Sequence, residues 1–253
     1  MGRAHHRRFL VSPEALRDAE VTFSPAQARQ LSAVLRLRAG DPVAVFDGAG
    51  REWAAQLTLV TPRRAAARLL GEEARDAPPR LRLTLAQVVP RGAAMDLIIA
   101  KATELGVSRI VPLEAARSVR RGAAARQGAR WRRLIAEASE QCGRRSVPEL
   151  ADACSLGELL QRHPSDEPLL ACDRGAGSSP LAGWCQALAT APALTVVVGG
   201  EGGLSAEEVD CVRLHGGRLV SLGPRLLRAE TAALAALTVL QACVGDWAGP
   251  NAA

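Results

Sequence analysis

The apolar and polar positions follow two different patterns along the chain. Up to about residue 72, short apolar or β-branched runs are separated by turn signals such as Gly40-Asp41-Pro42. These runs lie at 8–11, 43–46, 53–61 and 65–70. Runs of this length, spaced by turns, are typical of the strands of a small barrel. One helix is expected among them, from Ser24 to about residue 37, because Ser24 and Gln27 form a capping box around Pro25.

Residues 71–79, GEEARDAPP, interrupt both patterns and predict a domain boundary. Beyond it a strand at 81–89, a helix at 93–105 and a strand at 107–113 follow one another. This βαβ order predicts a parallel sheet covered by helices. We therefore expect a β-rich domain over 1–72 and an α/β domain over 78–253.

The α/β domain is organised around residues 194–244. A buried-type strand at 194–198 leads into four glycines that surround Glu201, and Ser205 with Glu208 forms a capping box that starts a helix. A second strand at 218–222 leads into the loop 223–228 and a last helix. Two loops at strand ends can bring backbone N–H and C=O groups against a ligand, which is how an open α/β sheet forms a binding crevice.

The residues alone leave the role of the glycine loop open. No Gly-Lys-Ser/Thr follows the glycines, and the G-x-G-x-x-G spacing of a dinucleotide site is absent, so the loop does not match the known phosphate cradles. An ordinary connection between a strand and a helix would have the same form. The residues alone therefore do not distinguish a ligand-binding loop from an ordinary connection.

Two sequence motifs resemble those of a known family. GGEGGLSAEEV and SLGPRLLRAETAALAAL resemble the two terminal motifs of the RsmE-type ribosomal RNA (uridine-N3) methyltransferases, which belong to the SPOUT class. Segments 34–50, 89–119 and 130–150 also resemble that family. Two positions depart from it, because Gly200 replaces a usual proline and Gln30 stands in the place of a histidine.

The resemblance implies a fold and an activity. The fold would be a SPOUT-type parallel sheet with a C-terminal trefoil knot, preceded by a PUA-like β-barrel that binds RNA. The activity would be transfer of a methyl group from S-adenosyl-L-methionine to N3 of a uridine in 16S ribosomal RNA, either free or in the 30S subunit. A cytoplasmic homodimer is implied as well. The implied cofactor-binding residues are Cys172, Val198, Gly199, Gly200, Glu201, Gly202, Gly203, Leu222, Gly223, Leu226, Leu227 and Arg228.

Methylating a uracil nitrogen requires a bound cofactor, an oriented base and removal of the N3 proton. The candidates for the chemistry are Glu201, Arg228 and Glu230. Arg228 could stabilise enolate oxygens of the base, or it could pair with Glu230 or a helix end. Glu201 could act as a general base, or its carboxylate could fix the loop.

The net charge of +6 comes almost entirely from arginine, since Lys101 is the one lysine. A positive chain favours an anionic partner. Between 117 and 133 there are seven arginines and no acidic residue, which makes a candidate phosphate-binding patch as well as an ordinary solvated face. The RNA-binding candidates are Arg8, Arg36, Arg117, Arg120 and Arg121.

The six cysteines show no C-x-x-C spacing, so we expect reduced core thiols, no metal and no disulfide framework. We also expect no secretory signal and no membrane span, because the last helix is short and carries Glu230. That helix, 229–244, is apolar on more than one face, which predicts a subunit contact that includes Ala236.

Two rival functions remain on the residues alone. A non-catalytic RNA-binding module would need only the barrel and the arginines, and binding of labelled S-adenosylmethionine would argue against it. An α/β enzyme acting on an anionic small molecule would not bind ribosomal RNA in a salt-sensitive way.

Overall fold

The computed structural model describes residues 7–17, 19–114 and 123–249. The chain divides into two compact units. Unit 1 comprises Met1–Pro78 and Ser139–Val147, and unit 2 comprises Pro79–Ala138 and Pro148–Ala253. The sequence prediction, with domains 1–72 and 78–253, assigned the segment Ser139–Val147 to the second domain, whereas its contacts belong to the first.

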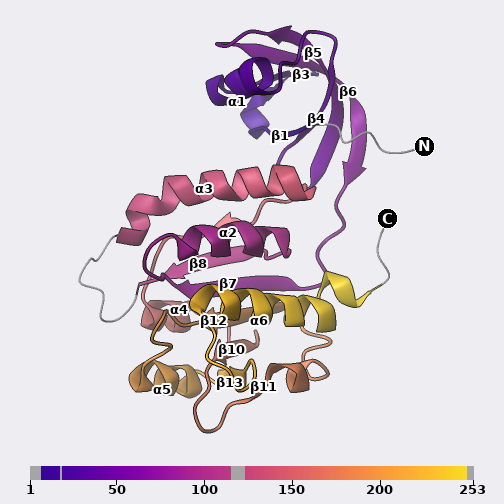
Figure 1. The fold of residues 1–253 in the computed structure, drawn as a ribbon. Helices are drawn as coiled ribbons and strands as arrows, with labels where there is room; N and C mark the ends of the chain where they lie inside the picture. Colours follow the sequence, from indigo (N-terminus) through magenta and orange to yellow (C-terminus); the bar gives the residue numbers. More distant parts are fainter. Residues whose placement is uncertain (1–6, 18, 115–122, 250–253) are drawn as a thin grey trace. The chain divides into compact units, whose positions relative to one another are not determined.

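Unit 1 is a six-stranded sheet that curls around an apolar core (Figure 1). In sheet order the strands are β1 (Arg8–Leu10), β4 (Pro42–Phe46), β5 (Arg51–Val60), β6 (Ala65–Arg75), β3 (Glu20–Thr22) and β2 (Leu16–Arg17). Alternate residues of the strands, such as Phe9, Val45 and Leu57, are fully buried and pack together. The short apolar runs predicted as strands therefore supply most of the core of this unit.

Strand β6 is longer than predicted and runs through the expected boundary at 71–79 as far as Arg75. Glu72 explains the extension, because it accepts hydrogen bonds from Arg51 of β5 at 2.7 Å and from Arg75 at 3.0 Å. These two arginines lower the pKa of the Glu72 carboxyl. A charged stretch that reads as a linker is thus a strand whose charges pair on the sheet surface.

The predicted capping box is present at the start of α1 (Pro25–Arg29). Ser24 Oγ accepts from the Gln27 backbone N–H at 3.3 Å, and the Gln27 side chain accepts from the Ser24 N–H at 3.1 Å. The helix then widens into a π-helical turn, Gln30–Val34, which ends before the predicted residue 37. Arg36 follows with a left-handed φ of 54°, a conformation that costs energy for a residue with a Cβ.

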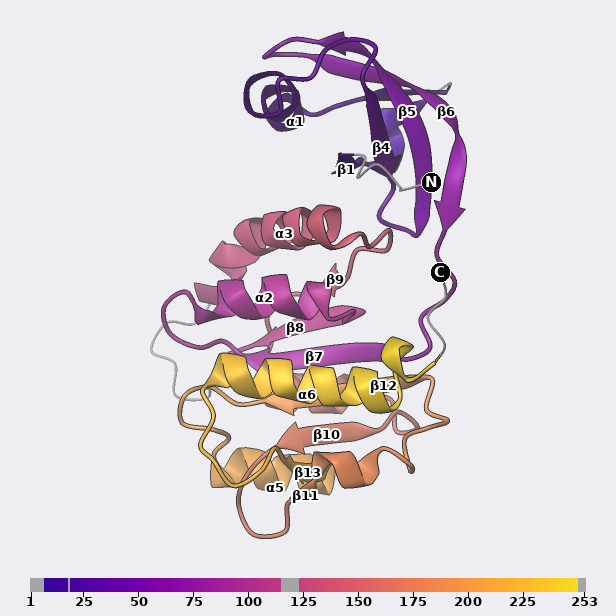
Figure 2. The ribbon, with the colours of Figure 1, turned by 45° about the vertical axis from the view of Figure 1, so that its right-hand side comes forward.

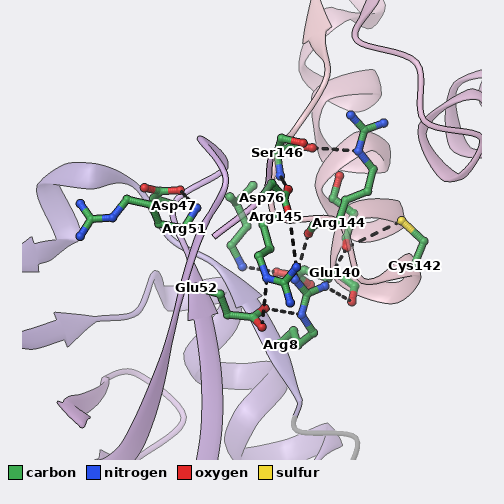
Figure 3. A network of polar contacts seen from close by, with 12 residues as sticks. Arg8, Asp47, Arg51, Glu52, Asp76, Glu140, Cys142, Arg144, Arg145 and Ser146 are labelled. Carbon is green, nitrogen blue, oxygen red and sulfur yellow. Dashed lines mark hydrogen bonds and ion pairs between the residues drawn. The ribbon is translucent and has the colours of Figure 1, made fainter. Parts of the chain in front are cut away.

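The segment Ser139–Val147 joins unit 1 through partly buried charges (Figure 3). Glu52 accepts from Arg8 Nε at 2.6 Å and pairs with Arg145 at 3.5 Å. Arg145 also pairs with Asp76 at 3.0 Å, and the Glu140 carboxylate accepts from the backbone N–H of β1 at 2.9 Å. Charges that are withdrawn from water need partners, and each of these charged side chains has at least one ion pair or hydrogen bond.

Unit 2 is a seven-stranded sheet in which every pair among the described strands is parallel. In sheet order the strands are β11 (Ser179–Pro180), β13 (Arg218–Ser221), β10 (Leu169–Cys172), β12 (Ala193–Val198), β7 (Arg82–Val88), β8 (Arg109–Leu113) and β9 (Glu149–Leu150). All carboxyl ends therefore lie along one edge of the sheet. The chain reverses its direction of winding where β7 and β12 pair, and such switch points are where open α/β sheets bind ligands.

Helices cover both faces of this sheet, as predicted (Figure 2). Helices α4 (Leu156–Arg162) and α5 (Ala206–Leu214) pack on one face through Leu156, Leu160 and Val212. Helices α2 (Ala94–Glu104) and α6 (Ala229–Cys243) contact each other, and α6 also contacts β12 and β7. The remaining helix, α3 (Ala123–Cys142), follows β8. Between β11 and β12 the chain forms a 3₁₀ turn, Leu181–Trp184.

Helix α6 packs mainly within its own subunit. Ala233, Ala236, Leu237 and Leu240 are fully buried, and the Gln241 amide donates to the Leu105 carbonyl at 2.9 Å. The segment Ala229–Ala248 is long and apolar enough to cross a membrane by length and composition, but a core helix passes the same test. The choice of Ala236 as a subunit-contact residue was wrong, because that position is already filled by the fold of one chain.

Two of the six cysteines form a disulfide, Cys185–Cys243, with their Cα atoms 5.5 Å apart. The prediction of six reduced thiols is wrong for this pair. Cys185 and Cys243 are 58 residues apart in the sequence, and no local spacing reveals that α6 ends beside the 3₁₀ turn. Cys142, Cys154, Cys172 and Cys211 are free thiols.

Candidate active site

A cavity of about 580 Å³ opens where the carboxyl ends of β10, β12 and β13 meet. Three loops, 172–175, 198–204 and 222–227, supply most of its lining, and the first turn of α6 supplies the rest. All of the predicted cofactor residues except Arg228 line it. The lining residues that sequence reasoning missed are Asp173, Arg174, Gly175, Leu204, Val220, Arg225, Ala229 and Ala232.

The glycines of the loop after β12 differ in how much space a side chain would have. A Cβ on Gly199 would lie 2.5 Å from the carbonyl carbon of Gly203, so the two strands of the loop approach as closely as only glycine allows. Gly203 has a left-handed φ of 73°, and its N–H donates to the Gly200 carbonyl at 3.0 Å. A Cβ on Gly202 would meet no atom within 4 Å, so Gly202 is the open side of the loop.

Gln87 on the neighbouring strand β7 supports this loop, and its role was not predicted from the sequence. It is fully buried at the end of β7, directly opposite Val198. Its amide donates to the carbonyl oxygens of Val88 at 2.9 Å, Val198 at 3.3 Å and Gly199 at 3.1 Å. An amide side chain near the end of a mostly apolar strand was the available signal, since a buried amide requires partners.

Glu201 holds the glycine loop to the neighbouring loop. Its Oε1 accepts a hydrogen bond from the Arg91 backbone N–H at 2.7 Å, and Arg91 lies in the connection from β7 to α2. Of the two roles left open by the sequence, this contact fits the loop-fixing acceptor. Glu230 is half-buried in the first turn of α6, outside the cavity lining.

The donor set fits a nucleoside-containing cofactor with an amino-acid part. Backbone groups of the glycine loop can contact an adenine edge, while Asp173, Arg174 and Arg225 offer charges to hydroxyl, ammonium and carboxylate groups. The volume lies within the range of about 300–1,000 Å³ that is usual for small-molecule sites. Among the described residues no three metal-binding side chains gather.

Comparison with known proteins shows the family of the chain. Residues 77–241 match the model of the RNA methyltransferase domain, and residues 32–70 match the RNA methyltransferase PUA domain. The ribosomal RNA small subunit methyltransferase E of Synechocystis is 34% identical over 93% of this chain and 77% of its own length. The chain belongs to the ribosomal RNA small subunit methyltransferase E family. The Bacillus subtilis protein of that name is 32% identical over 82% of this chain and 84% of its own length.

A solved member of the methyltransferase E family confirms the predicted fold class. The crystal structure of the Neisseria gonorrhoeae enzyme bound to S-adenosyl methionine superimposes with a TM-score of 0.86 at 32% identity. The match covers 96% of this chain and 100% of the other. The α/β parallel sheet and the PUA-like barrel are thus confirmed, while the trefoil knot stays a prediction.

In this methyltransferase E family member the arginines expected to contact RNA differ in their surroundings. Arg8 is buried in the network around Glu52, and its guanidinium also donates to the Arg144 carbonyl at 3.0 Å, which makes it a structural residue and corrects the prediction. Arg36 is exposed. Arg117, Arg120 and Arg121 lie outside the described residues.

Arg228 stands at the N-cap of α6 with an extended backbone and an exposed side chain. Among the described residues no ion pair joins it to Glu230, so that one of the structural pairings left open by the sequence is not made. Its neighbour Leu227 lines the cavity.

Proposed function

We propose that this chain transfers the methyl group of S-adenosyl-L-methionine to N3 of a uridine in small-subunit ribosomal RNA. The observation that carries the proposal is the cavity at the carboxyl edge of the sheet, whose glycine loop is held by Gln87 and Glu201. The bound cofactor supplies an electrophilic methyl group. The chain itself binds the cofactor through backbone groups, orients the base and stabilises the charge that develops as the N3 proton leaves.

We assign the charge-stabilising role to Arg228. Deprotonated uracil carries negative charge on its carbonyl oxygens, and an arginine can donate charge-assisted hydrogen bonds to them. The exposed guanidinium next to the cavity has the position for that task. Glu201 keeps its loop in place through Arg91, and Glu230 lies in the first turn of α6, outside the cavity lining.

For the RNA contacts the exposed Arg36 remains our candidate in the barrel, together with Arg117, Arg120 and Arg121. Arg36 follows a π-helical turn and has a left-handed backbone, two features that are often found at functional sites. Val34 beside it is 74% exposed, so the turn presents both a cation and an apolar side chain.

We further propose that the working enzyme is a cytoplasmic homodimer. Helix α6 has a second stripe of small or apolar side chains that is not fully buried in the protomer: Thr231, Leu234, Ala235, Thr238 and Ala242. Their spacing of three and four residues places them on one side of the helix. Small side chains allow another helix to approach closely, and a two-fold contact would place the same stripe on both subunits.

The proposed reaction is tested by methyl transfer in vitro. Small-subunit ribosomal RNA, free and as assembled subunits from a strain that lacks the modification, is incubated with the protein and methyl-labelled cofactor. We expect N3-methyluridine in the nuclease digest when it is resolved by mass spectrometry. A labelled 2′-O-methyl nucleoside would overturn the N3 assignment, and the absence of label in both substrates would overturn the activity.

A further inference from the structure

A second cavity, of about 370 Å³, lies beside the first in unit 2. It is formed by the connection from β7 to α2, the first turn of α2 and the middle of α3. Its lining residues are Val89, Gly92, Ala93, Met95, Asp96, Gln127, Arg130 and Trp131. Neither the cofactor loops nor the candidate catalytic residues contribute to it, so this cavity has no role in the function described above.

The second cavity is next to the glycine loop. Strands β7 and β12 are paired neighbours, and adjacent strands lie about 5 Å apart. The hydrogen bond from the Arg91 N–H to Glu201 at 2.7 Å holds their two loops together. Since Arg91 directly precedes Gly92 of the second cavity, a chain molecule placed over the cofactor can continue into this cavity without a long detour.

The lining of the second cavity combines apolar and charged groups. Met95 and Trp131 line the cavity with the small part of their surface that is exposed, 2% and 3%, and they make its floor apolar. Arg130 and Asp96 form an ion pair at the rim, where their side chains are 58% and 22% exposed. An exposed pair of this kind contributes little to stability and can exchange its partner for a ligand.

This combination matches the parts of a nucleotide. An apolar floor accepts the face of a base, a guanidinium binds phosphate, and a carboxylate or the Gln127 amide accepts a hydrogen bond from a ribose hydroxyl or a base N–H. Sequence-specific RNA recognition uses unstacked bases held in this way. The target uridine itself must face the first cavity, where the cofactor binds, so the second cavity is left for a different nucleotide.

We propose that the second cavity binds a nucleotide that flanks the methylated uridine and thereby sets which uridine is presented. The proposal rests on the proposed function, because it assumes an RNA substrate. The flanking nucleotide would place its base on the Met95–Trp131 floor and its phosphate on Arg130. Specificity would then come from two adjacent cavities, one for the reacting base and one for its neighbour.

A matched pair of variants on α3 tests the site. Arg130→Gln removes the rim cation, while Arg133→Gln removes the same charge from the same helix, where it pairs with Glu137 at 3.2 Å and is 73% exposed. We expect Arg130→Gln to weaken RNA binding about tenfold and to lower its salt slope by about one. Arg133→Gln should change affinity less than about twofold, and both variants should keep their affinity for S-adenosylmethionine.

An abasic scan identifies the nucleotide. RNA oligonucleotides that carry a single abasic site at each position beside the target are measured with the wild type and with Trp131→Leu, which changes the floor and keeps it apolar. One abasic position should weaken wild-type binding about tenfold, as expected for loss of one stacked base. That same position should matter less for the variant. Equal effects of Arg130→Gln and Arg133→Gln in an enzyme that still methylates would overturn the second cavity alone, whereas a wild type that methylates no RNA would overturn the proposed function.

Discussion

Gln87 Nε2 lies 3.1 Å from the carbonyl oxygen of Gly199, so a buried amide on one strand fixes the first residue of the cofactor loop on the next. Gln87→Glu keeps the shape but cannot donate while it is ionised. We therefore expect cofactor affinity to fall at least about tenfold at neutral pH. It should recover as the pH falls, because burial raises the pKa of a carboxyl group and its protonated form again has a donor.

The measurement for Gln87 is the calorimetric dissociation constant of S-adenosylmethionine between about pH 5 and 8, a range chosen around ordinary and raised carboxyl pKa values. The wild type should show no such recovery, and Gln87→Leu should bind weakly at every pH. A variant carrying glutamate that binds the cofactor as tightly as the wild type at the upper end of this range would show that the amide is not a positioning group.

The two ends of the glycine loop should respond differently to alanine. Gly199→Ala forces a Cβ to within 2.5 Å of the Gly203 backbone, and backbone cannot move aside cheaply. Gly202→Ala places its Cβ in open space. We expect more than about tenfold weaker cofactor binding for the first variant and a smaller effect for the second, with thermal melting as the control for folding. Equal affinities would mean that the loop shape does not matter for binding.

Restoring the family's usual proline should help this chain. Gly200 has no left-handed φ, and a Cβ at this position would make an ordinary 3.4 Å contact with Val88. Proline removes conformational freedom from the unbound loop, an effect worth about 0.4–1 kcal/mol at a compatible site. Gly200→Pro should thus tighten cofactor binding about two- to fivefold in calorimetry. Weaker binding would indicate that this loop needs its freedom to close.

Cys172 should be a protected thiol although it lines the cavity. Burial, assisted by the Asp173 carboxylate, raises the pKa of the Cys172 thiol to about 12. Its thiolate form, the reactive one, is therefore scarce at about pH 9. We expect iodoacetamide at that pH to label the exposed Cys142 in peptide mass maps and to leave Cys172 intact.

The raised pKa of Cys172 also means that the folded state loses stability as the pH rises. An unfolded cysteine ionises near about pH 8.5, whereas the folded one keeps its proton to about 12, so stability is lost as the pH rises between these values. Labelling of Cys172 as fast as Cys142 in mildly alkaline buffer would contradict both expectations.

The dimer is tested on the exposed stripe of α6. Thr238→Arg places a charge in the proposed contact without disturbing the protomer, because Thr238 is exposed. Sedimentation should show monomers, and methyl transfer should be lost. Leu214→Arg is the matched control, since Leu214 is 85% exposed on α5, which packs beside α4. A wild type that sediments as a monomer at micromolar concentration and still methylates would contradict the dimer.

The sequence was informative wherever a local signal decides the structure. The capping boxes at Ser24 and Ser205 start helices where predicted, and the glycines after residue 198 lie at the end of a buried strand. These features depend on contacts within a few residues, so a single chain reveals them. The strand-to-loop pattern therefore located two of the three loops of the cavity, while the third loop and the cofactor came from the family resemblance.

The missed features all depend on partners far away in the sequence. Strand β6 continues through Glu72 because Arg51 pairs with it, Gln87 matters because β12 lies beside β7, and Cys185 meets Cys243 because α6 ends near the 3₁₀ turn. Arg8 was predicted to contact RNA because its partner within the fold is also distant in the sequence. Its buried partner Glu52 is 44 residues away.

The return of Ser139–Val147 to unit 1 means that the two modules of this protein are not interchangeable parts. A gene cut after residue 78 would produce a barrel whose Glu52 and Asp76 both lack Arg145, with Arg8 deprived of its carbonyl acceptors. Recombination between relatives would thus have to carry two separate pieces of coding sequence together. The barrel can therefore be exchanged between relatives only together with the segment Ser139–Val147.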